Sequence, residues 1–540
     1  MSGERRRRHL WTAGAAALGL AGAGYCAWAV LGGQDTAPRS GPLSAAEVRS
    51  AAHGFLDAWA GGDTAAAADR TDDARAAGAA LRDYRDGAHL VARDLRPGTA
   101  AGARVPFSVE SEFAYEGARA PLTYTTALTV VRRAGDGKAV VRWEPRVLHP
   151  GLGQGRRLVA RQAGEAPVRA LDRAGHPLDT RAMPSLGPLV DGLRRTYGKT
   201  AGGTPGVELR LAAAGAAGAH AKRPGGTALL SVPEGRPGRV RTTLDARVQK
   251  VAEREVARRA DASIVVLKPS TGEILAVADS GGDARNRALE GRLAPGSTMK
   301  MITGSLLLEK GIADPDKPHP CPRTASYGGW RFHNVDDFDI SGGTFRDSFA
   351  ASCNTAFVSQ AGKLADDDLS RQARDVFGIG AGWSVGVGAF DGAVPVEHAA
   401  SKAASLIGQA RVRMNPLTMA SVVSTARTGR FRQPFLVAPS VDHRKLATAR
   451  RALVPRAHDQ LRDLLHTTAT SGSAAGAMAG LRGDIGAKTG SAEVTGQEKP
   501  NGWFAAWRGD LAAAAVMVRG GRGGASSGPL VAAVLTSAGG

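Results

Sequence analysis

This chain of 540 residues has few cysteines and few aromatic residues: three cysteines, and 5% Phe, Trp and Tyr together. None of its cysteines and histidines has the spacing of zinc ligands, and no His-Glu-x-x-His segment is present. The sequence therefore gives no sign of a metal site, and we expect no cofactor. Apolar residues make up 43% of the chain, which is enough for hydrophobic cores, and the length predicts two or three domains.

Acidic residues are fewer than basic ones, 50 against 70, so the formal net charge is +20. Such a balance favours anionic partners, among them nucleic acid, anionic lipid headgroups and anionic cell-wall polymers. The arginines are spread along the chain and are not interleaved with aromatic residues, so no nucleic-acid-binding stripe is visible and we expect no nucleic acid partner. A general Arg, Ala and Gly bias of the whole sequence explains the charge about equally well.

A long apolar segment near the start of the chain sets the expected location of the rest. Basic residues from Arg5 to His9 precede an apolar stretch from Leu10 to about Gly33. A membrane-spanning helix needs about 20 residues, whereas the apolar core of a secretory signal has only about 7–15. Residues 27–29 (Ala-Trp-Ala) would suit a signal peptidase, but we interpret residues 1–33 as an uncleaved signal-anchor. Because positive charge stays inside, we expect a single-pass protein of the cell membrane with a cytoplasmic N-terminus.

The three cysteines fall into two groups under this topology. Cys26 lies in the apolar segment, while Cys321 and Cys353 would lie outside the cytoplasm, where a disulfide is allowed. The sequence leaves open whether these two cysteines pair.

The first half of the chain contains a domain and a connecting region. Residues 43–155 open with Ser44 and Glu47, which are placed to form a capping box, and continue with strand-like segments. Asp136-Gly137 between two of these segments predicts a hairpin, so the domain is expected to be α+β. It holds no catalytic cluster, which favours a spacer or docking role. Residues 156–241 are rich in Gly, Ala, Pro and Arg and predict a small, partly ordered linker.

Residues 242–540 have the pattern of one α/β domain. A helix is predicted over 242–260, and a hairpin over 263–279 with its turn at Pro-Ser-Thr-Gly. The chain ends with two predicted strands and an apolar helix near 530–537. About 300 residues lie at the upper end for a single core.

Three short motifs in this domain point to chemistry. Ser297 and Lys300 stand three residues apart at a predicted helix start, which places a hydroxyl beside an amine. Ser352-Cys353-Asn354 follows about 50 residues later, and Lys488-Thr489-Gly490 comes about 135 residues after that. Each motif alone is weak. Ser-x-x-Lys, Ser-x-Asn and Lys-Thr-Gly in this order are the set found in penicillin-binding proteins and class A β-lactamases.

With its flanking segments, the chain resembles the class B penicillin-binding proteins, the membrane-anchored transpeptidases that cross-link peptidoglycan. The resemblance runs from Thr242 to the C-terminus and includes the segments TTLDARVQ, PSTGEILAVAD, LAPGSTMKMITGSLLLEKG, SCNTAF, IGQARVRMNPLTMAS and KTGSAE. Ala410 stands where the family usually has Gly, and Ser491 where it usually has Thr. The join VRALDRAGHPL lacks the first Gly of the family pattern, and the linker that follows is short and degenerate, which affects the expected partner contacts more than the chemistry.

The resemblance implies a multidomain protein. Its expected parts are the N-terminal membrane anchor (1–33), an α+β NTF2-like domain (43–155), a linker or pedestal region (156–241) and a C-terminal α/β penicillin-binding, serine β-lactamase-like transpeptidase domain (242–540). The implied partners are peptidoglycan stem peptides, β-lactams as covalent inhibitors, the cytoplasmic membrane, and a glycosyltransferase of the wall-synthesis machinery.

The implied reaction is acyl transfer through a serine acyl-enzyme. Ser297 is the expected nucleophile, Lys300 its base when neutral, and Ser352 the relay of a proton to the leaving amine. Burial and a nearby cation lower the pKa of a lysine, and Lys488 could be that cation. The backbone N–H groups of Ser297 and Ser491 would form the oxyanion hole. Substrate binding is expected from Asn354, Lys488, Thr489, Gly490 and Ser491.

Two other functions share these motifs. A β-lactamase or D,D-carboxypeptidase could carry the same triad, but a class A β-lactamase needs a deacylating glutamate, and Glu397 is the only one between Asn354 and Lys488. A non-catalytic scaffold of a wall-synthesis complex is favoured weakly by the altered linker and opposed by the intact motifs.

Two further motif matches are discounted. Residues 524–528 fit Gly-x-Ser-x-Gly, but no Asp or His follows them, and residues 192–200 resemble a P-loop with one residue too many between the glycines.

Overall fold

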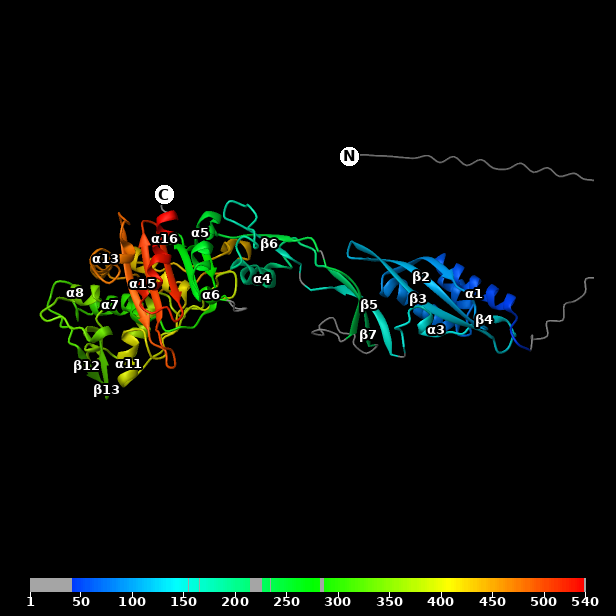
Figure 1. Ribbon diagram of the computed structural model, residues 1–540, viewed down its shortest axis with the longest axis horizontal. Helices are drawn as coiled ribbons and strands as arrows, with labels where there is room; N and C mark the ends of the chain where they lie inside the picture. Colours follow the sequence, from blue (N-terminus) through cyan, green and yellow to red (C-terminus); the bar gives the residue numbers. More distant parts are fainter. Residues whose placement is uncertain are drawn as a thin grey trace, which may run out of the picture. The chain divides into compact units, whose positions relative to one another are not determined.

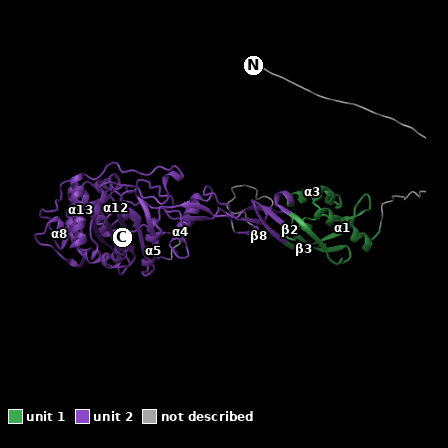
Figure 2. Cartoon of the chain, turned by 90° about the horizontal axis from the view of Figure 1, so that it is seen from above, with its two compact units in different colours: residues 1–84, 91–111, 123–154 green, residues 85–90, 112–122, 155–540 purple. Residues whose placement is uncertain are grey.

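The computed structural model describes residues 41–153, 155–164, 166–213, 226–233, 235–281 and 286–538. The predicted anchor and the linker stretch 214–225 lie outside these residues. Within the described ranges, no helix is long and apolar enough to cross a bilayer. Contacts within the chain separate two compact units: residues 1–84, 91–111 and 123–154 form one, and residues 85–90, 112–122 and 155–540 form the other (Figure 2).

The N-terminal domain is α+β, as predicted, and has a four-stranded sheet in the order β1-β2-β3-β4 (Figure 1). The Ser44–Glu47 capping box begins the first helix, and Trp59 of that helix packs edge-on against Phe107 of β2 at 6.3 Å. Asp136-Gly137 lies in the turn that joins β3 and β4. The elements are α1 Ala45–Ala60, α2 Thr64–Asp69, α3 Ala74–Arg82, β1 Leu90–Pro97, β2 Arg104–Tyr115, β3 Ala118–Arg132 and β4 Ala139–Val141.

The described parts of the linker region are more ordered than the composition predicted. An antiparallel sheet has the order β5-β7-β8, and β6 and β9 form a parallel pair. Helix α4, Leu186–Tyr197, buries Leu186, Leu189 and Leu193 on one face, a helical spacing that the surrounding Gly and Pro residues obscure. This helix contains most of the P-loop-like segment. The strands are β5 Arg156–Gln162, β6 Val168–Leu171, β7 Val207–Ala213, β8 Gly226–Val232 and β9 Gly238–Arg241.

A five-stranded antiparallel sheet in the order β11-β10-β16-β15-β14 forms the centre of the C-terminal domain. Alternate residues of β10 are buried on opposite faces: Ile264 and Val266 lie in the core shared with α5 and α16, while Val265 and Leu267 lie in the core shared with α12. Both faces of the sheet are therefore covered. The strands are β10 Ala262–Lys268, β11 Glu273–Asp279, β14 Ile485–Ala492, β15 Asn501–Arg508 and β16 Leu511–Met517.

Strand β14 carries the Lys-Thr-Gly motif, and helical segments around the sheet carry the Ser-x-x-Lys and Ser-x-Asn motifs. The helix, hairpin, terminal strands and terminal helix predicted for this domain are all confirmed. The further elements are α5 Ala246–Ala257, α6 Arg287–Glu290, α7 Lys300–Glu309, β12 Thr324–Tyr327, β13 Trp330–His333, α8 Phe345–Ala350, α9 Thr355–Val358, α10 Asp368–Asp375, α11 Ala399–Leu406, α12 Pro416–Thr428, α13 Pro455–Thr470, α14 Ala475–Met478, α15 Gly523–Ser526 and α16 Gly528–Ala538.

Candidate active site

Ser297 lies on a single 3₁₀ turn, Gly296–Met299, that leads into α7. The α-helix itself begins at Lys300, slightly later than the helix start predicted near Ser297. Gly296 has φ +52°, and a Cβ atom there would lie 2.4 Å from the carbonyl oxygen of Ser491. Glycine is required because the turn presses directly against strand β14, and this close approach brings the Ser297 motif beside the Lys-Thr-Gly motif.

Lys300 is fully buried, and its Nζ lies among three oxygen atoms. The Nζ is 2.9 Å from Oγ of Ser297, 2.8 Å from the carbonyl oxygen of Ser352 and 2.7 Å from Oδ1 of Asn354. Burial, reinforced by the charge of Lys488, holds the pKa of Lys300 well below its usual value. A neutral amine has two N–H groups and one lone pair. The two carbonyl oxygens accept the two N–H groups, so the lone pair is left facing the Ser297 hydroxyl, as a general base requires.

Ser352 lies in the loop between α8 and α9 and has φ +62°, in the left-handed region that a serine adopts only at a cost. This conformation presents both ends of the residue to buried lysines. Its carbonyl oxygen accepts from Lys300, and its Oγ accepts from Nζ of Lys488 at 2.8 Å. The loop thus places Ser352 between the two amines.

The third motif lies on β14, where the backbone ladder with β15 fixes its register. Lys488 pairs with Ala505 and Gly490 with Trp503. Burial lowers the pKa of Lys488 to about 7. A Cβ atom at Gly490 would lie 2.9 Å from the carbonyl oxygen of Pro295, so this glycine allows the strand to approach the Ser297 turn. Thr489 exchanges a hydrogen bond of 2.8 Å with the hydroxyl of Ser473.

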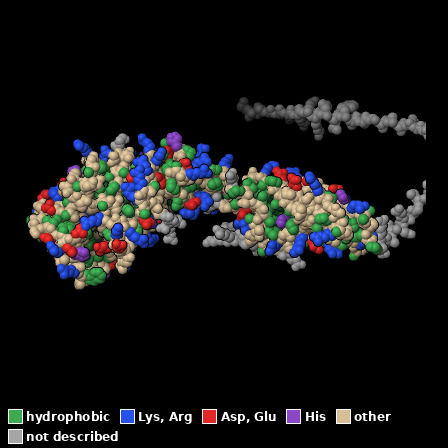
Figure 3. Space-filling view, viewed as in Figure 1, with side chains coloured by type: hydrophobic (Ala, Val, Ile, Leu, Met, Phe, Trp, Pro, Cys, Tyr) green, Lys and Arg blue, Asp and Glu red, His purple; other side chains and the backbone are tan. Residues whose placement is uncertain are grey.

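A cleft of about 1300 Å³ opens over these motifs and is lined by Ser297, Asn354 and Ser491. Its wall carries charges of both signs, and Trp330 on β13 stands at 68% exposure beside it. The cleft has room for an extended peptide with charged ends. On the face drawn in Figure 3, Lys and Arg side chains are scattered over both units and do not gather in one stripe. The charged residues that line the cleft are Arg292, Arg331, Arg413, Arg522, Asp336, Glu493 and Glu498.

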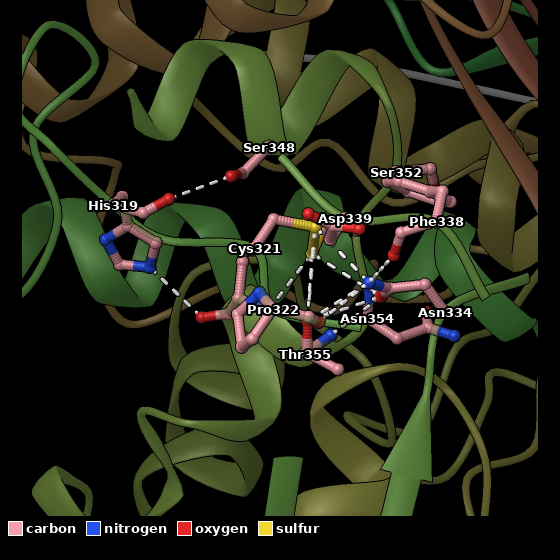
Figure 4. Close-up of a disulfide and its surroundings, with 12 residues drawn as sticks. His319, Cys321, Pro322, Asn334, Phe338, Asp339, Ser348, Ser352, Asn354 and Thr355 are labelled. Atoms are coloured by element: carbon pink, nitrogen blue, oxygen red, sulfur yellow. Dashed lines mark hydrogen bonds between the residues drawn. A yellow bond between two sulfur atoms is a disulfide. The ribbon is translucent and has the colours of Figure 1, made fainter. Parts of the chain in front are cut away.

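Two features of the site have no signature in the sequence motifs. Cys321 and Cys353 form a disulfide, which ties the middle residue of Ser-x-Asn to the segment before β12. Asn334, fully buried after β13, contacts both this disulfide and Asn354 (Figure 4). The predicted placement of both cysteines outside the cytoplasm was the one sequence signal compatible with a disulfide. No sequence signal distinguishes Asn334.

The structure therefore brings together all the residues predicted for the site. The hydroxyl of Ser297 and the amine of Lys300 are in direct contact, and Asn354 and Ser352 complete the surroundings of that amine. Lys488 reaches the same group through Ser352. Gly490 and Ser491 lie where β14 meets the Ser297 turn, and Thr489 lies beside them on the strand.

A family model described as the penicillin binding protein transpeptidase domain matches residues 262–536, which contain all of these residues. The chain belongs to this family. Among the relatives of this transpeptidase is the peptidoglycan D,D-transpeptidase PbpA of Mycolicibacterium smegmatis, 29% identical over 361 residues that cover 56% of this chain and 73% of the relative. PbpA of Mycobacterium tuberculosis is 27% identical over 373 residues, with the same two coverages. The assignment to class B made from the sequence is thus confirmed.

Solved structures show the same fold. Pseudomonas aeruginosa PBP2, in complex with WCK 5153, matches 69% of the transpeptidase and 96% of its own chain, with a TM-score of 0.53 and 21% identity. Penicillin binding protein 3 of Mycobacterium tuberculosis, in its apo form, matches 70% of the transpeptidase and 96% of its own chain, with a TM-score of 0.54 and 18% identity.

The discounted serine motif is a structural element of the transpeptidase. Residues 524–528 span α15 and the start of α16. Ser526 donates its hydroxyl hydrogen to the carbonyl of Arg522, and Ser527 donates to the carbonyl of Gly502. Both hydroxyl groups serve local backbone structure, in keeping with the prediction that this segment is not a nucleophile elbow.

Proposed function

We infer that the chain is a peptidoglycan D,D-transpeptidase that cross-links stem peptides through an acyl-enzyme on Ser297 and is inhibited by β-lactams. The observation that carries this inference is the contact of 2.9 Å between the Ser297 hydroxyl and the buried Lys300 amine. It lies within the segment matched by the transpeptidase family. The names of the PbpA relatives support the same substrate and reaction.

Acylation begins when Oγ of Ser297 attacks the carbonyl carbon between the last two D-alanines of a stem peptide. The hydroxyl proton passes to the neutral Lys300 amine as the C–O bond forms. The negative charge that develops on the carbonyl oxygen is met by the backbone N–H groups of Ser297 and Ser491. When the C–N bond breaks, the departing D-alanine amine takes its proton from the Ser352 hydroxyl, whose Oγ is in contact with Lys488. The proton that Lys300 gained replaces it, so that Ser352 is a hydroxyl and Lys300 a neutral amine again. The products are the acyl-enzyme and D-alanine.

Substrate binding is assigned to the two remaining motifs. Lys488 and Thr489 receive the terminal carboxylate of the stem peptide, and the backbone of Gly490 and Ser491 borders the scissile bond. The Asn354 amide holds the substrate backbone and also fixes Lys300, a role that its hydrogen bond of 2.7 Å to the amine supports. Deacylation follows when the amine of a neighbouring stem peptide attacks the acyl carbonyl and gives a proton to Lys300. Lys300 returns it to Oγ of Ser297 as the ester C–O bond breaks.

The class A β-lactamase alternative requires a deacylating glutamate. Oε1 of Glu397 lies 2.7 Å from Nε of Arg411, so the one glutamate between the second and third motifs is engaged in an ion pair. A carboxypeptidase would use the same groups with water as acceptor, and only the products separate it from a transpeptidase. The scaffold alternative offers no reason for two buried lysines around a half-buried serine.

The wider assignments rest on the sequence. We propose that residues 1–33 anchor the chain in the cell membrane with the N-terminus in the cytoplasm, that residues 43–155 form an NTF2-like domain, and that residues 156–241 connect it to the catalytic domain at 242–540. A partner glycosyltransferase is supported by a fold neighbour solved in work titled "Structural coordination of polymerization and crosslinking by a peptidoglycan synthase complex", with a TM-score of 0.52. The cytoplasmic membrane and peptidoglycan itself are the other proposed partners.

Product analysis tests this function. The full chain is incubated with a stem pentapeptide and an excess of an amine acceptor peptide, and products are resolved by mass spectrometry. Release of D-alanine together with a cross-linked dimer is the expected result. Release of D-alanine with the hydrolysed tetrapeptide alone would indicate a carboxypeptidase, and no release from the folded chain would indicate a scaffold.

A further inference from the structure

The loop that carries Ser352 and Asn354 has no sheet or long helix to hold it. It lies between two helical segments, α8 and the single-turn α9, and Ser352 within it has an unfavourable positive φ. Yet this loop supplies two of the three oxygen atoms around the Lys300 amine. Something outside the loop must therefore fix it, because a shift of about 1 Å in a catalytic contact can cost about 10²-fold in rate.

Asn334 supplies that support with all of its hydrogen-bonding capacity. Its Oδ1 accepts from the backbone N–H of Asn354 at 2.7 Å and from that of Thr355 at 3.1 Å. Its Nδ2 donates to the carbonyl oxygens of Pro322 at 3.0 Å and Phe338 at 2.8 Å. A short side chain with both an acceptor and two donors is needed to meet four backbone groups, and among the natural residues only asparagine provides it at this length.

The residue next to Asn334 fixes the other end of Asn354. The carbonyl oxygen of His333 accepts from Nδ2 of Asn354 at 3.1 Å. With Nδ2 held there, Oδ1 of Asn354 is turned toward Lys300. Residues 333–334 thus set both the backbone position and the amide orientation of Asn354.

We propose that Asn334 is a positioning residue for the acylation step. By holding Asn354, and through it Ser352 two residues earlier, it keeps two acceptors on the N–H groups of Lys300, so that the lone pair of the amine faces Ser297. Asn334 itself is fully buried and does not touch the substrate cleft surface. The proposal rests on the roles proposed above for Ser297 and Lys300.

Asn415 provides a matched control for the structural part of this role. It is equally buried, its Nδ2 donates to the carbonyl oxygens of Leu289 at 2.7 Å and Phe390 at 2.8 Å, and its Oδ1 accepts from the backbone N–H of Thr418 at 2.9 Å. It caps α12 and contacts none of the three motifs. Removing either amide should destabilise the fold through unsatisfied backbone groups, but only Asn334 should affect the reaction.

The test separates binding from acylation with a fluorescent penicillin. Stopped-flow measurements on the full chain in detergent give the dissociation constant K of the non-covalent complex and the acylation rate constant k2, for wild type, Asn334→Ala, Asn415→Ala and Lys300→Ala. Thermal melting confirms that each variant is folded at the assay temperature. We expect both asparagine variants to melt earlier, and k2 to fall about 10²-fold in Asn334→Ala alone, with a much smaller change in K.

Asn334→Ser guards against a variant that does not fold. Its hydroxyl can keep part of the contact with the loop, so k2 should lie between wild type and Asn334→Ala. The proposal is overturned if k2 in the folded Asn334 variant matches Asn415→Ala, or if the loss lies in K alone. Wild-type k2 in Lys300→Ala would instead overturn the proposed role of the lysine, whatever the asparagine variants do.

Discussion

The Lys-Thr-Gly strand and the Ser-x-Asn loop face the same serine but are held in different ways. Strand β14 is fixed by a continuous backbone ladder with β15, from Ile485 opposite Arg508 to Ala492 opposite Asn501. The loop around Ser352 has no ladder. Ser352 and Cys353 donate backbone hydrogen bonds to carbonyl oxygens of α8, and the Asn354 end is held by the Asn334 side chain and by a disulfide. A motif on a strand is supported by main-chain hydrogen bonds that hardly depend on side-chain identity. A motif on a loop depends on single side chains far away in sequence.

Lys300 lies between these two regions, and both affect its amine. Its amine contacts the loop directly, and the charge of Lys488 on the strand adds to the effect of burial on its pKa. The following changes act on this contrast, in order of decreasing expected effect.

Lys300→Ala removes the group on which both regions converge. Without a base for the Ser297 hydroxyl, we expect the acylation rate constant for a fluorescent penicillin to fall by about 10²–10⁴-fold while the fold is retained. Lys402→Ala is the control, since Lys402 is also buried but is engaged with Asp366 at 2.9 Å, away from the motifs. Equal acylation rates in the two variants would contradict the assignment of the base.

Replacing both Cys321 and Cys353 with serine weakens the loop and leaves the strand intact. The bridge closes a loop with a sequence separation of 32 residues, and its loss should lower the free energy of unfolding by about 3–4 kcal/mol. Acylation should slow as well, because Cys353 lies between Ser352 and Asn354. Urea unfolding and penicillin labelling check both effects, and treatment of the wild type with a thiol reductant should reproduce them. An unchanged acylation rate would show that Asn334 alone holds the loop.

The pKa of Lys488 tests how completely strand β14 buries this side chain. It is lowered to about 7 in the folded chain, against about 10.4 in an unfolded one. Between these values the unfolded chain binds more protons, so the free energy of unfolding should rise with pH through this window, by up to about 1.4 kcal/mol per pH unit from this residue. Below the folded pKa both states are protonated and the contribution becomes constant.

Denaturant titrations at pH values inside that window, on wild type and on Lys488→Met, isolate this contribution. The rise of stability with pH should be smaller in the variant, since methionine does not titrate. Equal slopes in the two proteins would mean that Lys488 is not desolvated to this extent.

Ala410→Gly is the smallest change. Ala410 has φ +56°, a left-handed conformation that an alanine adopts at a cost of about 1–2 kcal/mol and a glycine adopts freely. We expect the relief of this strain to raise the free energy of unfolding by about 1 kcal/mol. The larger backbone entropy of glycine in the unfolded chain offsets part of that gain. Ala404→Gly, within helix α11, should instead destabilise by about 1 kcal/mol. A loss of stability in Ala410→Gly would contradict the backbone geometry described for this turn.

The strand and the loop also differ in how far they could be predicted from the sequence. The segments WFAAWRG and LAAAAVMVRGG predict two strands, and Lys488 stands at the start of a further strand-like run. The three motifs identified every group around the Ser297 hydroxyl because the family's chemistry requires them in that order. The family's usual glycine at position 410 is explained by the structure, because Ala410 has a positive φ.

The support of the loop could not be predicted. Asn334 acts through four backbone groups that come together only in the folded chain, and no spacing in the sequence marks it. Neither the residue type of Ser352 nor its neighbours in the sequence indicate that its φ is positive. In the linker region, the high Gly and Pro content hid the apolar face of α4. The composition therefore predicted less ordered structure there than the fold contains.

The most direct measurement of the central claim is a time course of covalent labelling of the full chain by a fluorescent penicillin, with Ser297→Ala beside the wild type. If Ser297 is the nucleophile of a penicillin-binding transpeptidase, the wild type forms a stable label and the variant forms none. Equal labelling of the folded variant would contradict the assignment of Ser297, and the absence of label from the folded wild type would contradict the acyl-enzyme itself.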